Sequence, residues 1–347
     1  MIGRYYLAAR SLFVILVALL AGMIVILAVS EDPSVAIVAF FFSTFTNTYY
    51  LGNLLANTIP LILTGLAAAI AFSASSFNLG LEGQVYMGSL VGTFFGVRIL
   101  TALPPLPGTV AILLFSLISG GIIAGLSGLL KARRGVNELI SSLLLSNGLI
   151  LLVDYFIEGP FNDRPSGLAA SFSIPSKFRF ERILPPSNLH TGLFIAILAS
   201  VAVWFFLFKT RGGYNLRVTG KDPEFAYYGG VNVGRVYFWA MFLSGSFAAL
   251  GGMVDVLGVH GRVMRGFSSG YGWNGIAVAL IARNHPLLVV PAALFFAYLE
   301  IGAQIASFEA GLTPELSRLI QSIVFYLVTA DAILSFLRRR RAHGKLS

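Results

Sequence analysis

The 347-residue sequence contains no cysteine, which excludes thiolate catalysis, disulfide bonds and cysteine-type zinc sites. Its four histidines show no ligand spacing, and no Ser-His-Asp set is present. A GxxxxGK[ST] phosphate loop is also lacking, so the chain cannot itself hydrolyse ATP by the P-loop route. We therefore expect a protein that is not an enzyme and that binds no metal or cofactor directly.

Charged residues are scarce as well. They make up 11% of the sequence, against about 25% in an average soluble protein, while 56% of the residues are hydrophobic. The stretches Ser11–Ser30, Pro33–Leu81 and Ile99–Leu130 carry no charge at all. A helix needs about 20 apolar residues to cross a bilayer core, and unbroken apolar runs favour helices over alternating barrel strands. The sequence predicts an all-α integral membrane protein.

We predict about ten transmembrane helices in a single domain covering residues 1–347. The predicted spans are residues 7–29, 51–73, 85–100, 109–130, 138–156, 191–208, 236–257, 271–282, 287–307 and 316–337. The first apolar stretch, of about 19 residues, exceeds a typical signal-peptide core and is interpreted as an uncleaved signal anchor. Pro104, Pro105 and Pro107 predict a rigid turn. Whether residues 34–50 lie along the interface or belong to a span is left open.

The basic residues indicate the orientation. With the N-terminus inside, 16 of the 24 Lys and Arg residues fall on the cytosolic side, and the inverse topology reverses the ratio. Both termini and the loop 211–235 are thus predicted to be cytosolic, and the loop 158–189 external. The net charge of +9 does not indicate nucleic acid, because the basic residues sit at span ends rather than on one face. Ten spans divide into two halves of five. Because each half has an odd number of spans, the second half would be inverted relative to the first.

Each half has a glycine-rich polar break before a short apolar segment, at Asn78–Gly88 and at Gly270–Gly275. Corresponding breaks of this kind indicate a pathway at the midplane of a transporter. Our candidates for lining a substrate pathway are Asn78, Glu82, Gln84, Trp273 and Asn274. For Glu82 the alternatives are that it pins the break or that it caps the helix that begins the third span.

Several glycines suggest close packing rather than chemistry. Gly270–Gly275 matches GxGxxG literally, but no strand precedes it, so a bent and close-packed helix entry is favoured over a dinucleotide site. The pairs Gly92/Gly96 and Gly121/Gly125 have the spacing that lets membrane helices approach each other.

The loop 211–235 contains a short helix pattern. Asp222 is a suitable N-cap and Pro223 a suitable first helical residue, while Gly229 and Gly230 would end the helix. A short capped helix on the cytosolic side is typical of a docking element. The residues that would make it are Asp222, Pro223, Glu224, Ala226, Tyr227 and Gly229.

Residues Phe77–Gln84 read FNLGLEGQ, which resembles the FNIGxEGQ signature of permease subunits of ABC importers in the sugar, nucleoside and branched-chain amino acid group. The match is best with the nucleoside or simple-sugar branch, and it covers about residues 50–337. Further similar stretches are Asn57–Ala71, Gly135–Ile140, Arg217–Val233 and Gly270–Pro286. Leu79, Asp255 and the Asn284-His285 pair depart from the usual residues and leave the substrate open.

The resemblance implies a permease subunit of the bacterial cytoplasmic membrane that forms the path for a small polar solute, such as a nucleoside, purine, simple sugar or riboflavin-like molecule. It also implies a separate ATP-hydrolysing subunit docked on Asp222–Gly229, a second homologous permease and an external solute-binding protein or lipoprotein. Two alternatives stay open. One is an ion-coupled secondary transporter using Glu82, Glu300 or Asp331, and the other is a membrane transferase, for which no cluster of acids or histidines is found.

Overall fold

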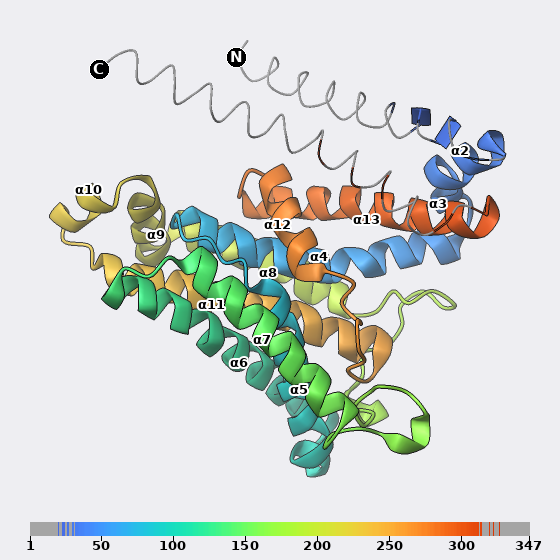
Figure 1. Ribbon diagram of the computed structural model, residues 1–347, viewed down its shortest axis with the longest axis horizontal. Coiled ribbons are helices and arrows are strands. Elements are labelled where there is room, and N and C mark those ends of the chain that lie inside the picture. The colour runs from blue at the N-terminus through green and yellow to red at the C-terminus, as the bar shows by residue number, and fades with distance from the viewer. Residues whose placement is uncertain are drawn as a thin grey trace. The chain divides into compact units, whose positions relative to one another are not determined.

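The computed structural model describes residues 32–311 and, outside that range, positions 20, 23, 24, 26, 27, 30, 313, 319, 322 and 326. Most of the predicted spans 7–29 and 316–337, both termini and Asp331 lie outside the described residues. The chain divides into two compact units, one of residues 1–54 and 294–347 and one of residues 55–293, called unit 1 and unit 2 below. Figure 1 shows the chain as a ribbon.

Helices occupy all eight predicted spans that fall on described residues. In chain order they are α4 (Thr48–Ser73), α5 (Leu81–Arg98), α6 (Pro105–Arg134), α7 (Glu138–Glu158), α8 (Gly192–Lys209), α11 (Val233–Asp255), α12 (Tyr271–Ile281) and α13 (Pro286–Glu309). Short helices lie between them: η1 (Leu100–Ala102), η2 (Arg164–Ser166), η3 (Ser176–Phe178), α9 (Arg211–Lys221), α10 (Pro223–Tyr228) and the π-helical η4 (Val256–His260).

Six of the described helices are long and apolar enough to cross a membrane, namely α4, α6, α7, α8, α11 with η4, and α13. Helix α12 has 11 residues, which at about 1.5 Å per residue reaches about half-way through a bilayer core. Helix α5 has 18 residues, among them Glu82 and Gln84. The prediction of an all-helical membrane fold is confirmed in this coarse form, while the number of ten spans and the inverted halves stay predictions.

Helices α5 and α6 each begin four residues earlier than the sequence pattern predicted. The proline-rich stretch was expected to form a turn, but Pro105 begins α6 and Pro107 lies in its first turn, because the first helical N–H groups need no partner within the helix. Helix α5 begins at Leu81 rather than at residue 85. The predicted break at Asn78–Gly88 therefore includes the helical first turn of α5, in which Glu82 and Gln84 are both buried.

Small residues hold α6 against α11 in unit 2. A Cβ atom on Gly120 would lie 2.4 Å from both Ala249 Cβ and the Gly245 carbonyl oxygen, so the two backbones are nearly in contact. Gly121 and Gly125 face the rings of Phe242 and Phe238 of α11. On α5, Gly92 faces Met253 and Gly96 faces Ile112. The packing role predicted for both glycine pairs is confirmed.

The outer side of α6 carries large apolar residues rather than small ones. Apolar side chains that recur every four residues are exposed along it, namely Leu106, Val110, Leu114, Ile118, Ile122, Leu126 and Leu130. Only 33% of the 18-residue apolar stretch of α6 is buried, against 72% for the corresponding stretch of α11 with η4. In a membrane protein such an apolar outer stripe contacts lipid hydrocarbon or another membrane subunit.

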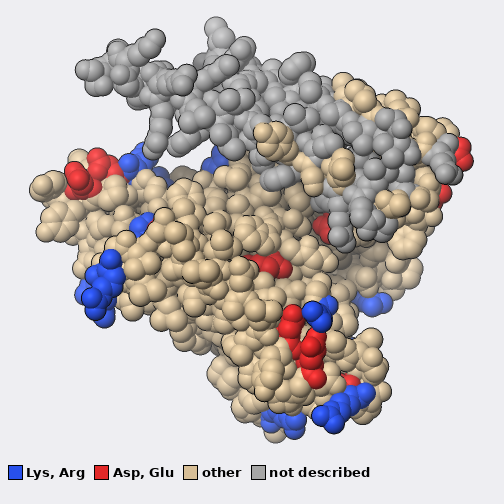
Figure 2. Space-filling view, in the orientation of Figure 1, with Lys and Arg blue, Asp and Glu red and all other residues tan. Residues whose placement is uncertain are grey.

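Unit 2 has two polar ends. Helices α9 and α10 lie at one end, and the segment between α7 and α8, with η2, η3 and three isolated bridges, lies at the other. At this second end Arg262 pairs with Asp163 at 3.2 Å, and Arg265 pairs with Glu158 at 2.9 Å. Figure 2 shows charged residues gathered near both ends on the face in view, with a largely uncharged surface between them.

In unit 1, residues 34–50 form two short helices and the start of α4 rather than one long helix. Helices α2 (Pro33–Phe41) and α3 (Ser43–Thr46) have nine and four residues, too few to cross a bilayer alone. The Tyr298 hydroxyl of α13 donates to the Phe41 carbonyl oxygen at 2.8 Å, and Gly302 packs on the backbone of Phe40. These contacts fix α2 to the second part of α13.

Gly120→Ala should lower the free energy of unfolding by about 1–3 kcal/mol, since its methyl group meets backbone and Cβ atoms that cannot move aside. The matched control is Gly148→Ala on α7, where nothing lies within 4 Å of the added Cβ. That variant should be neutral or slightly stabilising through helix propensity. Unfolding of the purified protein in detergent measures both, and equal stabilities would contradict the close packing of α6 on α11.

Candidate functional site

The first break, Asn78–Gly88, comprises the first two turns of α5 and the end of the segment of residues 74–80 between α4 and α5, which is called the α4–α5 connection below. Asn78 and Gln84 are 0% and 2% exposed, and their side-chain amides bond to each other in both directions, at 2.8 and 3.0 Å. Asn78 also donates to the Ser244 hydroxyl and accepts from the Gly80 N–H, both at 3.0 Å. The amides of Asn78 and Gln84 therefore hold the break in shape, and their donors and acceptors are largely used within the protein.

Serines of α7 bind the backbone of the same break. Ser142 accepts from the Leu79 N–H at 3.1 Å, and Ser146, one turn later, accepts from the Gly83 N–H at 2.8 Å. The first turn of a helix leaves its N–H groups without partners in the helix, and inside a membrane protein no water replaces them. Sequence reasoning missed both serines; their only signal is the spacing of four residues on an apolar helix.

The second break lies just before α12 and meets the first through Glu82. The Glu82 carboxylate accepts from the Gly272 N–H at 2.6 Å and from the Ser268 hydroxyl. Glu82 is 7% exposed, and no side chain caps its own helix α5. The carboxylate thus binds the N-terminus of another helix, where the helix dipole favours negative charge. Sequence reasoning considered a cap on α5 and missed Ser268.

Gly272 is required for this arrangement. A Cβ atom there would lie 2.3 Å from the Glu82 backbone nitrogen, and one on Gly275 would lie 2.4 Å from the Thr64 hydroxyl oxygen. Gly270, with φ of 91°, turns the chain into the helix. The close-packed helix entry that the sequence predicted at Gly270–Gly275 is confirmed.

Trp273 and Asn274 follow in the first turn of α12. Trp273 is 48% exposed, and Asn274 is half-buried. Of the five pathway candidates, Asn78, Glu82 and Gln84 therefore cluster in the interior at the start of α5, Glu82 joins them to α12, and Trp273 has the most accessible side chain. Among the described residues no group of three potential metal-ligating side chains is found.

The end of unit 2 at α9 and α10 holds the other predicted element. Asp222 accepts from the N–H groups of Glu224 and Phe225 at 3.0 Å each and Pro223 begins α10, as predicted. The helix ends in a Schellman motif, in which the Gly230 N–H bonds to Tyr227 O and the Val231 N–H bonds to Ala226 O. Gly230, not Gly229, has the positive φ, of 81°.

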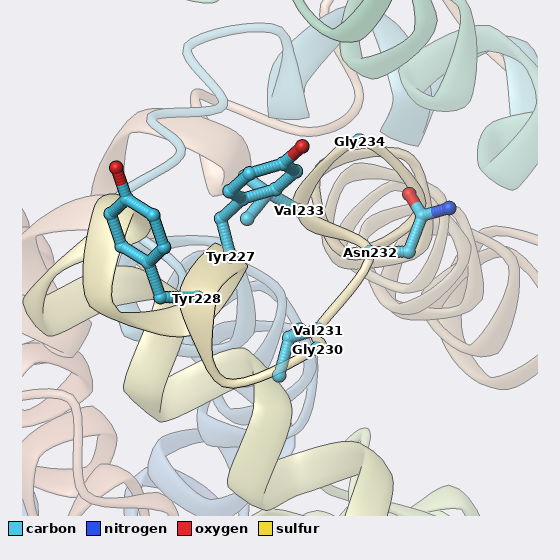
Figure 3. Close-up of a pocket in the computed structure, with 7 residues that line it drawn as sticks. All are labelled: Tyr227, Tyr228, Gly230, Val231, Asn232, Val233 and Gly234. Atoms are coloured by element: carbon cyan, nitrogen blue, oxygen red, sulfur yellow. The ribbon is translucent and has the colours of Figure 1, made fainter.

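The six-residue helix α10 presents aromatic rings to solvent. Ala226 is its buried contact, while Phe225, Tyr227 and Tyr228 are 65%, 70% and 86% exposed. An open groove of about 600 Å³ lies beside it, lined by Tyr227, Tyr228, Gly230, Val231, Asn232, Val233 and Gly234. Figure 3 shows the two tyrosine rings on one side of this groove and Asn232 on the other. Exposed rings beside a concave surface are typical of a protein-binding site.

Helix α9 was not predicted. Thr210 caps it by accepting from the Gly213 N–H at 3.1 Å, and Arg217 donates to the Leu207 carbonyl oxygen at the end of α8 at 2.9 Å. A Cβ on Gly213 would lie 2.1 Å from the Phe206 carbonyl oxygen. Gly213 thus allows α9, a helix within the predicted loop, to pack directly on the backbone of α8.

Glu82→Ala should lower the free energy of unfolding by about 1–3 kcal/mol, because it leaves the buried Gly272 N–H without an acceptor. The control is Glu224→Gln, an exposed acid in the first turn of α10, where we expect less than about 0.5 kcal/mol. Thermal unfolding of both purified variants in detergent tests this, and a Glu82→Ala protein as stable as the control would show that the carboxylate does not hold α12.

The chain is similar to known proteins of one family. The family model described as the branched-chain amino acid transport system / permease component matches residues 50–329. The glucose ABC transporter permease TsgB13 of Haloferax volcanii is 33% identical over 94% of this chain and 87% of its own. The probable riboflavin import permease RfuC of Treponema pallidum is 35% identical over 91% and 84%, and the guanosine ABC transporter permease NupP of Bacillus subtilis is 31% identical over 94% of both chains. The chain belongs to this family of ABC transporter permeases, the membrane-spanning transport subunits whose ATP hydrolysis is carried out by a separate subunit.

Proposed function

We propose that the protein is the permease of an importer in the bacterial cytoplasmic membrane, with ten spans, both termini and residues 211–235 in the cytosol, and residues 158–189 outside. The partners are an ATP-hydrolysing subunit, a second homologous permease, an external solute-binding protein or lipoprotein, and the surrounding lipid. Residues 211–235 contain α9 and α10 and carry four basic residues, in keeping with the positive-inside rule. Family membership does not favour the alternatives of an ion-coupled transporter or a membrane transferase.

The observation that carries this function is helix α10. Asp222 fixes its start, Gly230 fixes its end, and Ala226 anchors it, so three exposed aromatic rings project from a rigid support. Tyrosine and other large side chains in such positions supply most of the affinity of protein interfaces. ATP binding by the partner would move α10, and the differential affinity of α10 for two ATPase states would bias the spans between outward-open and inward-open forms.

Replacing both Tyr227 and Tyr228 by alanine should weaken binding of the ATPase subunit about tenfold or more, as truncation of interface hot spots does. Both side chains are exposed, so folding is expected to be normal. Co-purification of the ATPase subunit with the tagged permease measures the effect. The control is Tyr155→Ala at the far end of α7, where the side chain is 64% exposed. If the ATPase subunit co-purified with the double variant as well as with the unaltered permease, the docking role of α10 would be contradicted.

We further propose that the cargo is a small polar ring compound of the nucleoside, purine, simple sugar or riboflavin-like kind. Three relatives that this chain resembles are named for glucose, riboflavin and guanosine. Trp273 offers a 48% exposed indole ring beside Asn274. A ring face with a neighbouring amide suits a solute that has a flat face and polar edges, because aromatic faces stack on such rings while amides bond their edges.

Trp273→Ala should lower the apparent affinity for the transported solute about tenfold, the usual value of one stacking contact. Uptake of radiolabelled guanosine, glucose and riboflavin, each tested separately in proteoliposomes holding the complete importer, provides the measurement. Trp239→Ala, at a 52% exposed tryptophan of α11, is the matched control. ATP-dependent uptake of one compound is expected. Equal uptake by both variants would remove Trp273 from the pathway, and uptake of none of the three would contradict the solute class.

A further inference from the structure

The α4–α5 connection contacts α9 at its first residues and is continuous with Glu82 at its end. Ser75 lies beside Gly220, which is two residues before the cap of α10. Glu82, seven residues after Ser75, holds the N-terminus of α12. One short piece of backbone thus touches both the element next to the docking helix and the point where the two breaks meet.

The contact with α9 is close. The Ser75 hydroxyl donates to the Gly220 carbonyl oxygen at 2.6 Å. A Cβ on Gly220 would lie 2.2 Å from the Ser73 carbonyl oxygen, so only glycine lets the last turn of α9 rest on the end of α4. A displacement of α9 cannot be absorbed by a flexible side chain here, because backbone meets backbone.

Ser75 is held in an unfavourable conformation. Its φ is 48°, in the left-handed region that residues with a Cβ atom rarely adopt. Lys131 of α6 donates to the Ser75 carbonyl oxygen at 3.2 Å and to the Ser76 hydroxyl at 3.3 Å. Residues in such conformations persist only where their surroundings fix them, and they concentrate at sites that switch.

A largely buried ion pair also holds residues 75–77 in place. Lys131 Nζ lies 2.7 Å from Glu138 Oε1 of α7, with side chains 18% and 10% exposed, and 4.1 Å from the centre of the Tyr237 ring of α11. The same Glu138 oxygen accepts from the Phe77 N–H at 3.3 Å. Residues 75–77 are therefore held by one lysine of α6 and one glutamate of α7, and a tyrosine of α11 packs on the lysine.

We infer that Lys131, Glu138 and Ser75 are positioning residues for transport, which make the α4–α5 connection a stiff link between α9 and the Glu82–α12 contact. This inference rests on the proposed function, since α10 is taken to be the ATPase docking element. Movement of α10 and α9 on ATP binding shifts the backbone of residues 75–80, and Glu82 carries the shift to the start of α12. The ATPase thereby acts on the spans through backbone contacts.

The test uses a chemical probe to measure how accessible the α4–α5 connection is in each nucleotide state. The chain carries no cysteine, so Phe77→Cys, at a side chain 42% exposed, supplies a single labelling site within it. The importer complex is reconstituted with its ATPase, and the rate of maleimide labelling is compared without nucleotide and after trapping with ATP and vanadate. In Phe77→Cys alone we expect the two rates to differ about fivefold, the ratio that corresponds to one net hydrogen bond.

Adding Ser75→Ala, which removes the hydroxyl bonded to Gly220, should bring the two labelling rates to within about twofold, while ATP hydrolysis by the complex continues. The control is Ser73→Ala, whose hydroxyl bonds only within its own helix, to Ala69 O at 2.7 Å; it should keep the nucleotide response. A full response with Ser75→Ala overturns the inference and leaves the proposed function standing. A complex that forms but shows no response in Phe77→Cys alone also overturns the inference. Absence of any complex with the ATPase overturns the proposed function itself.

The ion pair is tested by the same labelling. Lys131→Met alone leaves Glu138 unpaired and can impair folding, so it is compared with the double variant Lys131→Met/Glu138→Gln, in which no buried charge is left alone. The double variant should fold, as measured by thermal unfolding. Its two labelling rates should nevertheless lie within about twofold of each other, as in Ser75→Ala, because the Ser75 carbonyl has still lost its donor. Recovery of the full nucleotide response in the double variant would mean that the pair only supports folding.

Discussion

Peptide groups in the interior of a membrane protein have no water to bond, and this constraint governs both interruptions in unit 2. In the first break, the Leu79 and Gly83 N–H groups bond to the hydroxyls of Ser142 and Ser146, and the Gly80 N–H bonds to the side-chain oxygen of Asn78. The N-terminus of α12 finds its partner in Glu82. Serines of α7 thus help to stabilise the first break, and Glu82, which belongs to the first break, satisfies the second. The two breaks cannot be treated as independent features, because the chemistry of one completes the other.

The need to satisfy every buried polar group also limits how these side chains can bind a solute. A buried amide that bonds on both edges, as Asn78 and Gln84 do, has to lose a protein contact to gain a solute contact. Such an exchange leaves a buried group unsatisfied, at a cost of about 1–3 kcal/mol. The side chains with free surface near the meeting of the breaks are different ones, above all Trp273. The polar residues of the FNLGLEGQ stretch are therefore best explained as architecture, and the solute contact that we propose lies at Trp273.

The sequence predicted those features whose cause is local. Charge-free runs marked the long helices, and Asp222-Pro223 with Gly229-Gly230 marked α10, because caps act within a few residues. Helix α9 was missed since its glycines, which weaken a helix by propensity, are used to rest on α8 and α4. Ser268 and the two α7 serines were missed for another reason. Their partners lie 63 to 186 residues away, and no spacing rule in one sequence relates residues so distant.

Transmission of force through the α4–α5 connection raises the question of how much free energy it must bear. Changing a two-state equilibrium from 1:99 to 99:1 takes about 5.5 kcal/mol, whereas one hydrogen bond contributes about 1 kcal/mol net. No single contact of Ser75 or Lys131 can carry such a load alone. The contacts act in parallel on a few residues, and where Gly220 meets Ser73 the two backbones lie so close that no Cβ atom fits between them. Repulsion at van der Waals contact rises far more steeply than a hydrogen bond weakens on stretching. The connection therefore works best when α9 moves toward α4, with the bonds of Lys131 and Glu138 keeping residues 75–77 from bending under the push.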